Sequence, residues 1–236
     1  MIKFSIVIPV YNESKNLPLL ISQIYKILRN QKYELIIVDD NSTDGTKDIM
    51  KKIKRSNLRY FIRTKNRDLT KSCIFGFQKS KYQNILVMDG DLQHRPVDIK
   101  KLLKTFENND ADFAIGTRKL FKSKKHNLGF FRLSASRILI LIVNIFLGKK
   151  TSDPMSGFFI FKKKIFTKNK SKLFSQGYKI LMDLLYISKE KTKNFDVEIN
   201  FDSRKKGTSK MSFKIVLSLI YMIFYKLYGK IFQKLS

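Results

Sequence analysis

Two aspartates stand two positions apart directly behind an apolar segment, where Ile85–Met88 is followed by Asp89-Gly90-Asp91-Leu92-Gln93-His94. Carboxylate oxygens are the ligands that hard divalent cations prefer, and a cation held in this way can grip a diphosphate. We therefore predict that Asp89 and Asp91 converge on one divalent cation. An isolated pair of this kind is more often a plain acidic turn, so the prediction depends on its neighbours.

Two earlier apolar segments also place polar residues at their C-terminal ends. Phe4–Pro9 leads into Tyr11 and Glu13, and Tyr33–Val38 leads into Asp39. In an open α/β sheet, ligands bind outside the carboxyl ends of the strands, where the strand order reverses. Three strand ends that each carry polar residues therefore predict one shared binding site.

Strand-like segments alternate with amphipathic helical segments along most of the chain, which predicts βαβ units and a mostly parallel sheet flanked by helices. The strictly alternating segment Asn194–Phe201 predicts a late, half-exposed strand. We expect the other strands near Phe4–Pro9, Tyr33–Val38, Leu58–Ile62, Ile85–Met88 and Phe113–Gly116. We expect helices near Asn16–Arg29, Thr46–Lys54, Thr70–Lys79, Pro96–Asn108, Arg132–Phe146 and Lys179–Lys189.

Several short motifs now bear on function, and their order along the chain matters more than any one of them. Together they span Phe4 to Lys210, and on them the chain resembles the family 2 glycosyltransferases, in particular the polyprenyl-phosphate sugar synthases of the dolichol-phosphate mannose synthase type. The motifs are Ile-Pro-Val-Tyr-Asn-Glu, Val-Asp-Asp-Asn-Ser-Thr-Asp-Gly-Thr, Met-Asp-Gly-Asp-Leu-Gln-His-Arg-Pro, Ile-Gly-Thr-Arg, Asp-Pro-Met-Ser-Gly-Phe-Phe and Arg-Lys-Lys-Gly-Thr-Ser-Lys.

The resemblance implies a nucleotide-diphospho-sugar transferase fold of the GT-A type and inverting transfer of a hexose to a polyprenyl (dolichyl-type) phosphate. The preferred donor is GDP-mannose. It implies that a divalent metal, Mg²⁺ or Mn²⁺, is held by Asp89, Asp91 and Gln93. The residues that it assigns to the nucleotide donor are Pro9, Tyr11, Glu13, Asp39, Gln93, Arg204 and Lys210, and those that it assigns to the acceptor phosphate are Arg118, Arg132 and Ser136. The residues with catalytic roles would be Asp89, Asp91, Arg118, Arg132 and Arg204, with Asp153 and Ser156-Gly157 on the sugar side of the pocket.

The chain departs from the pattern of that family at two positions. Asp68 stands where a Gly is usual before Leu-Ser/Thr, which bears on the loop between the third strand and its helix. Asp183 stands where a Glu is usual after Gly-Tyr-Lys, which is a chemically mild change.

Positive charge is concentrated in the second half of the chain. The formal net charge is +29, from 48 Lys and Arg and 19 Asp and Glu. Residues 1–118 hold 22 basic and 13 acidic side chains, whereas residues 119–236 hold 26 and 6. Such a field attracts nucleic acid or an anionic membrane surface. Because no zinc-finger spacing, RNP-type strand or Gly-x-x-Gly clamp accompanies the lysines, we expect a membrane partner and no nucleic acid.

The C-terminal segment has the pattern of an amphipathic helix, with an apolar stripe from Phe213 to Ile231 and lysines opposite. We expect a catalytic domain at residues 1–210 and a membrane-associating helix at 211–236, which lies in the interface; a short span and a helix packed on the core are the alternatives. The N-terminus has no signal-peptide pattern and Cys73 is the sole cysteine, which favours the cytoplasmic face of a membrane.

Other functions remain open on the sequence. The donor could be UDP-glucose or another hexose nucleotide, and the acceptor could be a saccharide. In a different class, the chain could be a non-catalytic, basic membrane-binding domain. Dinucleotide, P-loop, zinc-protease and serine-hydrolase motifs are absent from the sequence.

Overall fold

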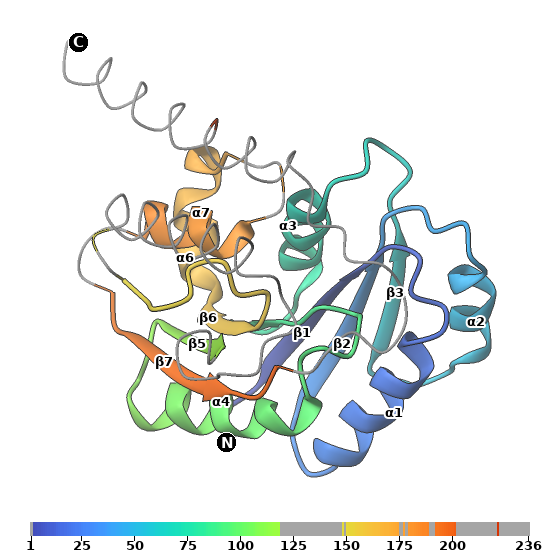
Figure 1. Ribbon diagram of the computed structural model, residues 1–236, viewed down its shortest axis with the longest axis horizontal. Coiled ribbons are helices and arrows are strands. Elements are labelled where there is room, and N and C mark those ends of the chain that lie inside the picture. Colours follow the sequence, from blue (N-terminus) through green and yellow to red (C-terminus); the bar gives the residue numbers. More distant parts are fainter. Residues whose placement is uncertain are drawn as a thin grey trace, which may run out of the picture.

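The computed structural model describes residues 2–118, 148, 150–174, 177, 179–188, 192–201 and 221. In this part of the chain, seven strands form one sheet in the order β3-β2-β1-β4-β6-β5-β7 (Figure 1). The strands are β1 (Phe4–Val10), β2 (Tyr33–Asp39), β3 (Leu58–Ile62), β4 (Asn84–Val87), β5 (Phe113–Arg118), β6 (Phe159–Lys162) and β7 (Asn194–Ile199). The helices are α1 (Leu17–Ile27), α2 (Thr46–Lys52), α3 (Leu69–Lys79), α4 (Ile99–Asn108), α6 (Lys163–Asn169) and α7 (Ile180–Ile187), with short 3₁₀ turns η1 (Pro96–Asp98) and η2 (Lys170–Lys172).

The centre of the sheet is parallel and fully covered. β1 pairs with β2 from Phe4 opposite Tyr33 to Val10 opposite Asp39, and every residue of both strands is buried. Parallel strands covered on both faces read as continuous apolar runs, which explains the β-branched composition of these segments.

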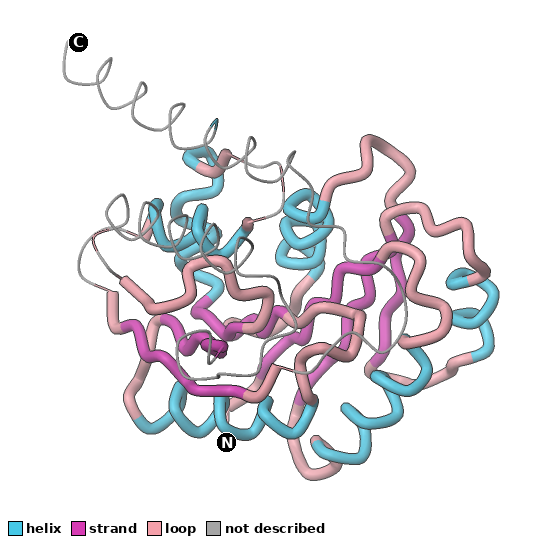
Figure 2. The backbone as a smooth tube through the Cα atoms, viewed as in Figure 1, coloured by secondary structure: helices cyan, strands magenta, loops and turns pink. Residues whose placement is uncertain are grey.

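Two apolar cores lie on the two faces of the sheet. One lies between the sheet and helices α1 and α4, and it includes Leu20 and Phe106. The other lies between the sheet and helices α3, α6 and α7, and it includes Phe77 and Leu184. Figures 1 and 2 show these helices on opposite sides of the strands. This three-layer arrangement leaves the two ends of the strands for loops.

The expected architecture is confirmed. The predicted strands and helices in the described part of the chain occur within a few residues of their expected bounds. The predicted late strand is β7, which is half-exposed. The helix expected at Pro96–Asn108 begins as the 3₁₀ turn η1 and continues as α4. The helix expected at Arg132–Phe146 lies outside the described residues.

One strand was missing from the prediction. β6 pairs antiparallel with both β4 and β5, so it joins the first four strands to β5 and β7. Its first three residues are all buried and its length is four residues. A short, uninterrupted apolar run of this kind has no helical or alternating period, so the pattern alone did not identify it.

Among the helices that the structure describes, none combines the length and the apolarity needed to cross a membrane. The predicted helix at 211–236 lies outside the described residues apart from Tyr221. Cys73 is buried in α3, as expected for a cysteine that packs as a small apolar side chain.

Candidate functional site

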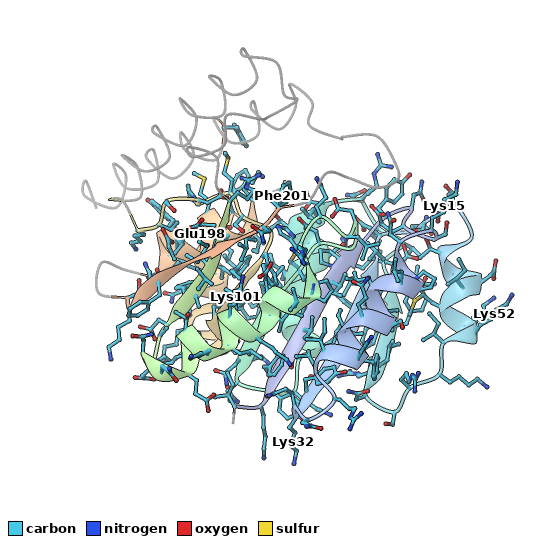
Figure 3. All side chains as sticks on the ribbon, turned by 60° about the horizontal axis from the view of Figure 1, so that its bottom comes forward. Lys15, Lys32, Lys52, Lys101, Glu198 and Phe201 are labelled. Atoms are coloured by element: carbon cyan, nitrogen blue, oxygen red, sulfur yellow. The ribbon has the colours of Figure 1, made fainter. Side chains whose placement is uncertain are left out.

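The polar residues at the ends of β1, β2 and β4 come together because these three parallel strands are neighbours in the sheet. The loops that follow β1 and β2 are hydrogen-bonded to each other: the Asp40 amide donates to the Val10 carbonyl at 2.9 Å, and the Asn12 amide donates to Ser42 Oγ at 2.8 Å. In Figure 3, Lys15 and Phe201 lie on this side of the molecule, and Lys32, which precedes β2, lies on the opposite side. The predicted sharing of one edge is therefore observed.

Asp89 stands just beyond β4, and its side chain is 38% exposed. Its carboxylate lies against Gly157, where a Cβ atom would be 2.3 Å from Oδ2 of Asp89. Glycine at 157 thus leaves the space that this carboxylate occupies. Asp91 is 9% exposed, and its Oδ1 accepts a hydrogen bond from the backbone N–H of Gln93 at 3.1 Å. The two carboxylates and the Gln93 side chain therefore belong to one tight turn.

His94 is buried beneath that turn and packs against two aromatic rings. Its ring stacks on Phe158 at 5.2 Å and meets Phe201 edge-on at 5.1 Å, and only 2% of its surface is exposed. Its Nδ1 lies 3.7 Å from Oδ2 of Asp89. Burial lowers the pKa of His94 to about 3, and the positive charge of Arg118 acts in the same direction. The ring is therefore neutral at physiological pH, and its packing against Phe158 and Phe201 holds the turn in place.

Arg118, at the end of β5, forms a two-pronged ion pair with Asp153. Nε and Nη2 donate to the two carboxylate oxygens at 2.7 and 2.9 Å, and Asp153 is buried. Burial alone would lower the pKa of Arg118, but the hydrogen bonds and charge of Asp153, with a contribution from Asp89, raise it. A planar guanidinium held by such a fork is fixed in direction, so Arg118 is a rigid cation close to the acidic turn.

Two residues predicted to bind the nucleotide donor, Asp39 and Glu13, form hydrogen bonds with other residues of the protein. Asp39 is buried; its Oδ1 accepts hydrogen bonds from the amide and hydroxyl of Ser42, and its Oδ2 accepts one from the Tyr60 hydroxyl at 2.5 Å. Burial is the main cause that raises the pKa of Tyr60, and the hydrogen bond to Asp39 acts in the same direction. Glu13 Oε2 accepts from the Asn16 amide group at 2.7 Å. Both carboxylates hold the loops in shape, whatever they bind in addition.

Tyr11 is half-buried, and its ring already has a partner. The guanidinium carbon of Arg67 lies 4.3 Å from the ring centroid, a distance typical of a cation–π contact. Pro9 is buried within β1, so it positions Tyr11 from inside the strand.

The two departures from the family pattern both have structural roles. Asp68 is the N-cap of α3: its Oδ1 accepts from the Lys71 amide at 2.9 Å, as a capping carboxylate does. Its Oδ2 accepts from the Gly177 amide at 2.6 Å. Asp183 is buried in α7, and its Oδ2 accepts from the Phe174 amide at 2.8 Å. The loop that contains Asp68 is therefore well defined.

A pocket beside Asp89 contains a residue that our sequence analysis did not assign to the site. Lys179 is half-buried there, and its Nζ donates to the Met155 carbonyl at 3.3 Å. The other lining residues include Asp89, Ser156, Gly157, Leu69 and Leu181. Burial lowers the pKa of Lys179, and Arg118 adds to this effect while Asp89 and Asp153 oppose it. A signal was present in the sequence, because a lysine follows Gly177 by two residues in an otherwise apolar segment.

The remaining predicted site residues, Arg132, Ser136, Arg204 and Lys210, lie outside the described residues. Within the described ranges, no three His, Cys, Asp or Glu side chains gather in a way that could hold a metal ion. The predicted metal site differs from such a cluster, because it uses two carboxylates and one amide. Carboxylate and amide oxygens suit Mg²⁺ or Mn²⁺, which take further ligands from water and substrate phosphates.

The layered sheet with acidic residues at the carboxyl end of β4 defines an α/β protein of the nucleotide-sugar transferase type. The sequence matches the description "Glycosyl transferase family 2" over residues 5–169, and the chain belongs to this family. The resemblance on which the sequence analysis relied is thereby confirmed.

Three relatives share the name "Dolichol-phosphate mannosyltransferase". The protein from Pyrococcus furiosus is 35% identical over 94% of this chain, and the match covers 63% of that protein's own length. The protein from Saccharomyces cerevisiae is 31% identical, with 93% of this chain and 85% of that protein covered. The protein from Mycosarcoma maydis is also 31% identical, with 92% and 76% covered.

Solved structures support the fold. Glucosyl-3-phosphoglycerate synthase from Mycobacterium tuberculosis, in complex with Mn²⁺, UDP-glucose and phosphoglyceric acid, has a TM-score of 0.66 at 16% identity, with 88% of this chain and 73% of that chain covered. The same protein in complex with UDP alone has the same TM-score at 17% identity. At this level of identity, the likeness concerns the GT-A fold alone.

Proposed function

We propose that this chain transfers a hexose, in the first instance mannose from GDP-mannose, to a polyprenyl phosphate with inversion at the anomeric carbon. The observation that carries the proposal is the placement of three features at one edge of the sheet: the β1 and β2 ends, the acidic turn after β4, and the Arg118–Asp153 pair. The names of the three relatives, each a dolichol-phosphate mannosyltransferase, support the same reaction.

In this proposal the residues at the ends of β1 and β2 bind the nucleoside. Pro9 and Glu13 shape the loop, and Tyr11 offers a ring face to the base. Asp39 keeps the following turn in place through Ser42. Arg204 and Lys210 would close over the phosphates.

We assign Mg²⁺ or Mn²⁺ to Asp89, Asp91 and Gln93. When bound, the cation stabilises negative charge on the leaving nucleoside diphosphate. His94 is neutral, stacks on Phe158 and meets Phe201 edge-on, and it keeps the turn that carries these ligands in one shape. Removal of the metal is therefore expected to abolish transfer while the protein stays folded.

A phosphate acceptor explains why no general base is needed. A sugar hydroxyl must lose a proton as it attacks, whereas a phosphate monoester has its second pKa near 6 and is largely a dianion at neutral pH. What the acceptor requires is positive charge that recruits and positions it. We assign that role to Arg118, Arg132 and Ser136.

The anionic surface of a membrane is the proposed location, because a polyprenyl phosphate lies there and because the second half of the chain carries most of the positive charge. We propose that residues 1–210 form the catalytic domain and that residues 211–236 lie in the interface at the cytoplasmic face. A chain truncated after residue 210 should no longer bind anionic liposomes but should still bind the nucleotide-sugar donor. Loss of folding on truncation would favour a helix packed on the core.

The reaction is tested by incubating the protein with Mg²⁺ or Mn²⁺, a polyprenyl phosphate and a panel of labelled donors that includes GDP-mannose and UDP-glucose. Label from GDP-mannose should appear in the organic phase. Label from another donor alone would correct the sugar, and transfer to a saccharide or to free polyprenol would overturn the acceptor. Absence of both donor binding and transfer would leave a basic membrane-binding domain.

The acceptor assignment makes a separate prediction for Arg132. Arg132→Ala should raise the apparent KM for polyprenyl phosphate by about tenfold or more, since a hydrogen bond to a charged group is lost, and should change the KM for the donor little. The matched control is Arg29→Ala, an exposed arginine just after α1 and away from the site. An equal rise in both KM values would contradict the assignment.

A further inference from the structure

Asp68 connects two parts of the molecule that are 109 residues apart in the sequence. Its carboxylate caps α3 through Lys71 and accepts the Gly177 amide, while the Thr70 amide donates to the Gly177 carbonyl at 3.0 Å. Both polar groups of the Gly177 backbone are therefore bound to the first turn of α3. Gly177 has φ +94°, a conformation that favours glycine.

The position of Asp68 is itself fixed from the end of β2. Its amide donates to Oδ2 of Asp40 at 2.6 Å, and Arg63 Nη1 donates to Oδ1 of the same aspartate at 2.5 Å. Arg63 also bonds Ser72 Oγ at 2.9 Å within α3. The backbone of Asp68 is thus fixed to Asp40 after β2, and the carboxylate of Asp68 in turn binds the backbone of Gly177.

Lys179 follows Gly177 by two residues and extends into the pocket beside Asp89. An ammonium group has three donors, and within the described part of the chain Lys179 uses one of them, toward the Met155 carbonyl. The walls next to it are largely apolar and include Leu69, Ile180 and Leu181. A pocket with an ammonium donor and apolar walls suits a phosphate ester that is attached to a hydrocarbon.

The cations of Lys179 and Arg118 both lie near the carboxylates of Asp89 and Asp153. Lys179 and Arg118 repel each other, and Asp89 and Asp153 attract both. Asp153 is already bound by Arg118 through both oxygens. A phosphate bound by Lys179 on this side of Asp89 would offset the repulsion between the two cations.

We propose that Lys179 binds the phosphate of the acceptor and that Asp68 is the positioning residue that keeps Lys179 in the pocket. This inference rests on the proposed function, because it takes the acceptor to be a polyprenyl phosphate. It adds a cation from the Gly177–Lys179 segment to the Arg118 side of the site and gives Asp68 a role that a glycine at the same position could not fill.

The test compares variants of the full chain by the KM for a polyprenyl phosphate and the KM for the sugar nucleotide. Lys179→Met removes the charge at similar length and should raise the acceptor KM by about tenfold or more, with the donor KM within about twofold. Lys179→Arg should retain most of the acceptor affinity. Asp68→Asn should move the acceptor KM in the same direction as Lys179→Met, by a smaller factor. Lys104→Met, an exposed lysine on α4, is the matched control.

A binding measurement without turnover makes the result independent of chemistry. A short-chain isoprenyl phosphate, titrated in the presence of nucleoside diphosphate, should bind the wild type and Lys179→Arg more tightly than Lys179→Met. Unchanged binding and unchanged acceptor KM in a folded Lys179→Met protein would overturn the proposal, and so would an equal rise in both KM values. If Lys179→Met does not fold, unchanged acceptor binding in folded Lys179→Gln would overturn it equally.

The failure of the proposed function has a different signature. A wild-type protein that binds the donor but transfers no sugar to any polyprenyl phosphate would refute the function and, with it, the role of Lys179. A wild-type protein that performs the transfer, with variants that behave like it, would refute only the role of Lys179.

Discussion

A Cβ atom on Gly157 would lie 2.3 Å from Oδ2 of Asp89, so these two residues occupy adjoining space that only a glycine leaves open. The loop that carries Gly157 therefore forms one wall for the carboxylate expected to hold the metal.

Gly157→Ala should displace the Asp89 carboxylate. We expect a loss of turnover of about tenfold or more, equivalent to about 1.4 kcal/mol of transition-state stabilisation, with a small change in thermal stability. Steady-state kinetics and a thermal melt provide the two measurements. Ser152→Ala, an exposed substitution in the same loop, should have neither effect. A fully active Gly157→Ala enzyme would show that Asp89 does not need its observed position.

The aspartates of the acidic turn should be essential. Asp89→Ala or Asp91→Ala should lower turnover by at least about a hundredfold, or about 3 kcal/mol, because each removes a hard oxygen ligand. Excess chelator should have the same effect on the wild type, and added Mg²⁺ or Mn²⁺ should reverse it. Asp48→Ala, an exposed aspartate of α2, is the control. Full activity of Asp91→Ala, or of the chelated wild type, would exclude the metal assignment.

His94 should make the folded state sensitive to acid. Its pKa is lowered to about 3 in the folded protein, by burial first and by Arg118 second, whereas an unperturbed histidine has a pKa of about 6.5. Below that value the unfolded chain binds a proton that the folded chain does not, so this contribution to stability is lost as the pH falls from 6.5 toward 3, by about 1.4 kcal/mol per pH unit.

Urea unfolding of the wild type and of His94→Gln at pH 6.5 and pH 4.5 isolates this contribution from that of other groups. The stability advantage of the wild type should shrink by about 2–3 kcal/mol between the two values. Parallel losses in both proteins would mean that His94 titrates normally in the folded state.

Glu34 should be the most sensitive acidic residue for stability. It is fully buried in β2 and accepts hydrogen bonds from Ser5 Oγ and the Lys81 amide, each at 2.7 Å, and from Arg59 Nη1 at 3.1 Å. Glu34→Ala should lower the free energy of unfolding by about 3–5 kcal/mol, since it removes one side of a buried, charged network. Asp48→Asn, on the surface, should change it by less than about 0.5 kcal/mol. A loss below about 1 kcal/mol for Glu34→Ala would contradict the role of the network.

The strand ends were predictable from sequence because their signal is local. A β-branched run that stops at Tyr11, Asp39 or Asp89 indicates both the strand and the edge of the sheet where it ends. The same local signals do not show how a side chain is used after folding. Asp39 was expected to face the nucleoside, whereas the fold shows that it also caps its own turn and binds Tyr60.

The parts of the site that depend on distant segments could not be predicted in this way. The contact of Gly157 with Asp89, the Arg118–Asp153 pair and the bond between Asp68 and Gly177 join residues that are far apart in the chain. Asp153 and Gly157 lie in the loop before the antiparallel strand β6, and this strand lacked a period that would reveal it. Lys179 stands out as a lysine in an apolar segment, but this local pattern does not indicate that Asp89 will be its neighbour.

The position of β6 also has a consequence for the order of folding. Strands β1 to β4 pair among themselves within the first 87 residues, whereas β4 and β5 gain their shared neighbour only when residues 159–162 have been made. Long-range pairing of this kind carries a large loop-closure cost and forms late. We expect strands β1 to β4, which carry the edge that we propose binds the nucleotide, to pair before β6 and β5 join the sheet. The edge of β4 would stay exposed until β6 pairs with it.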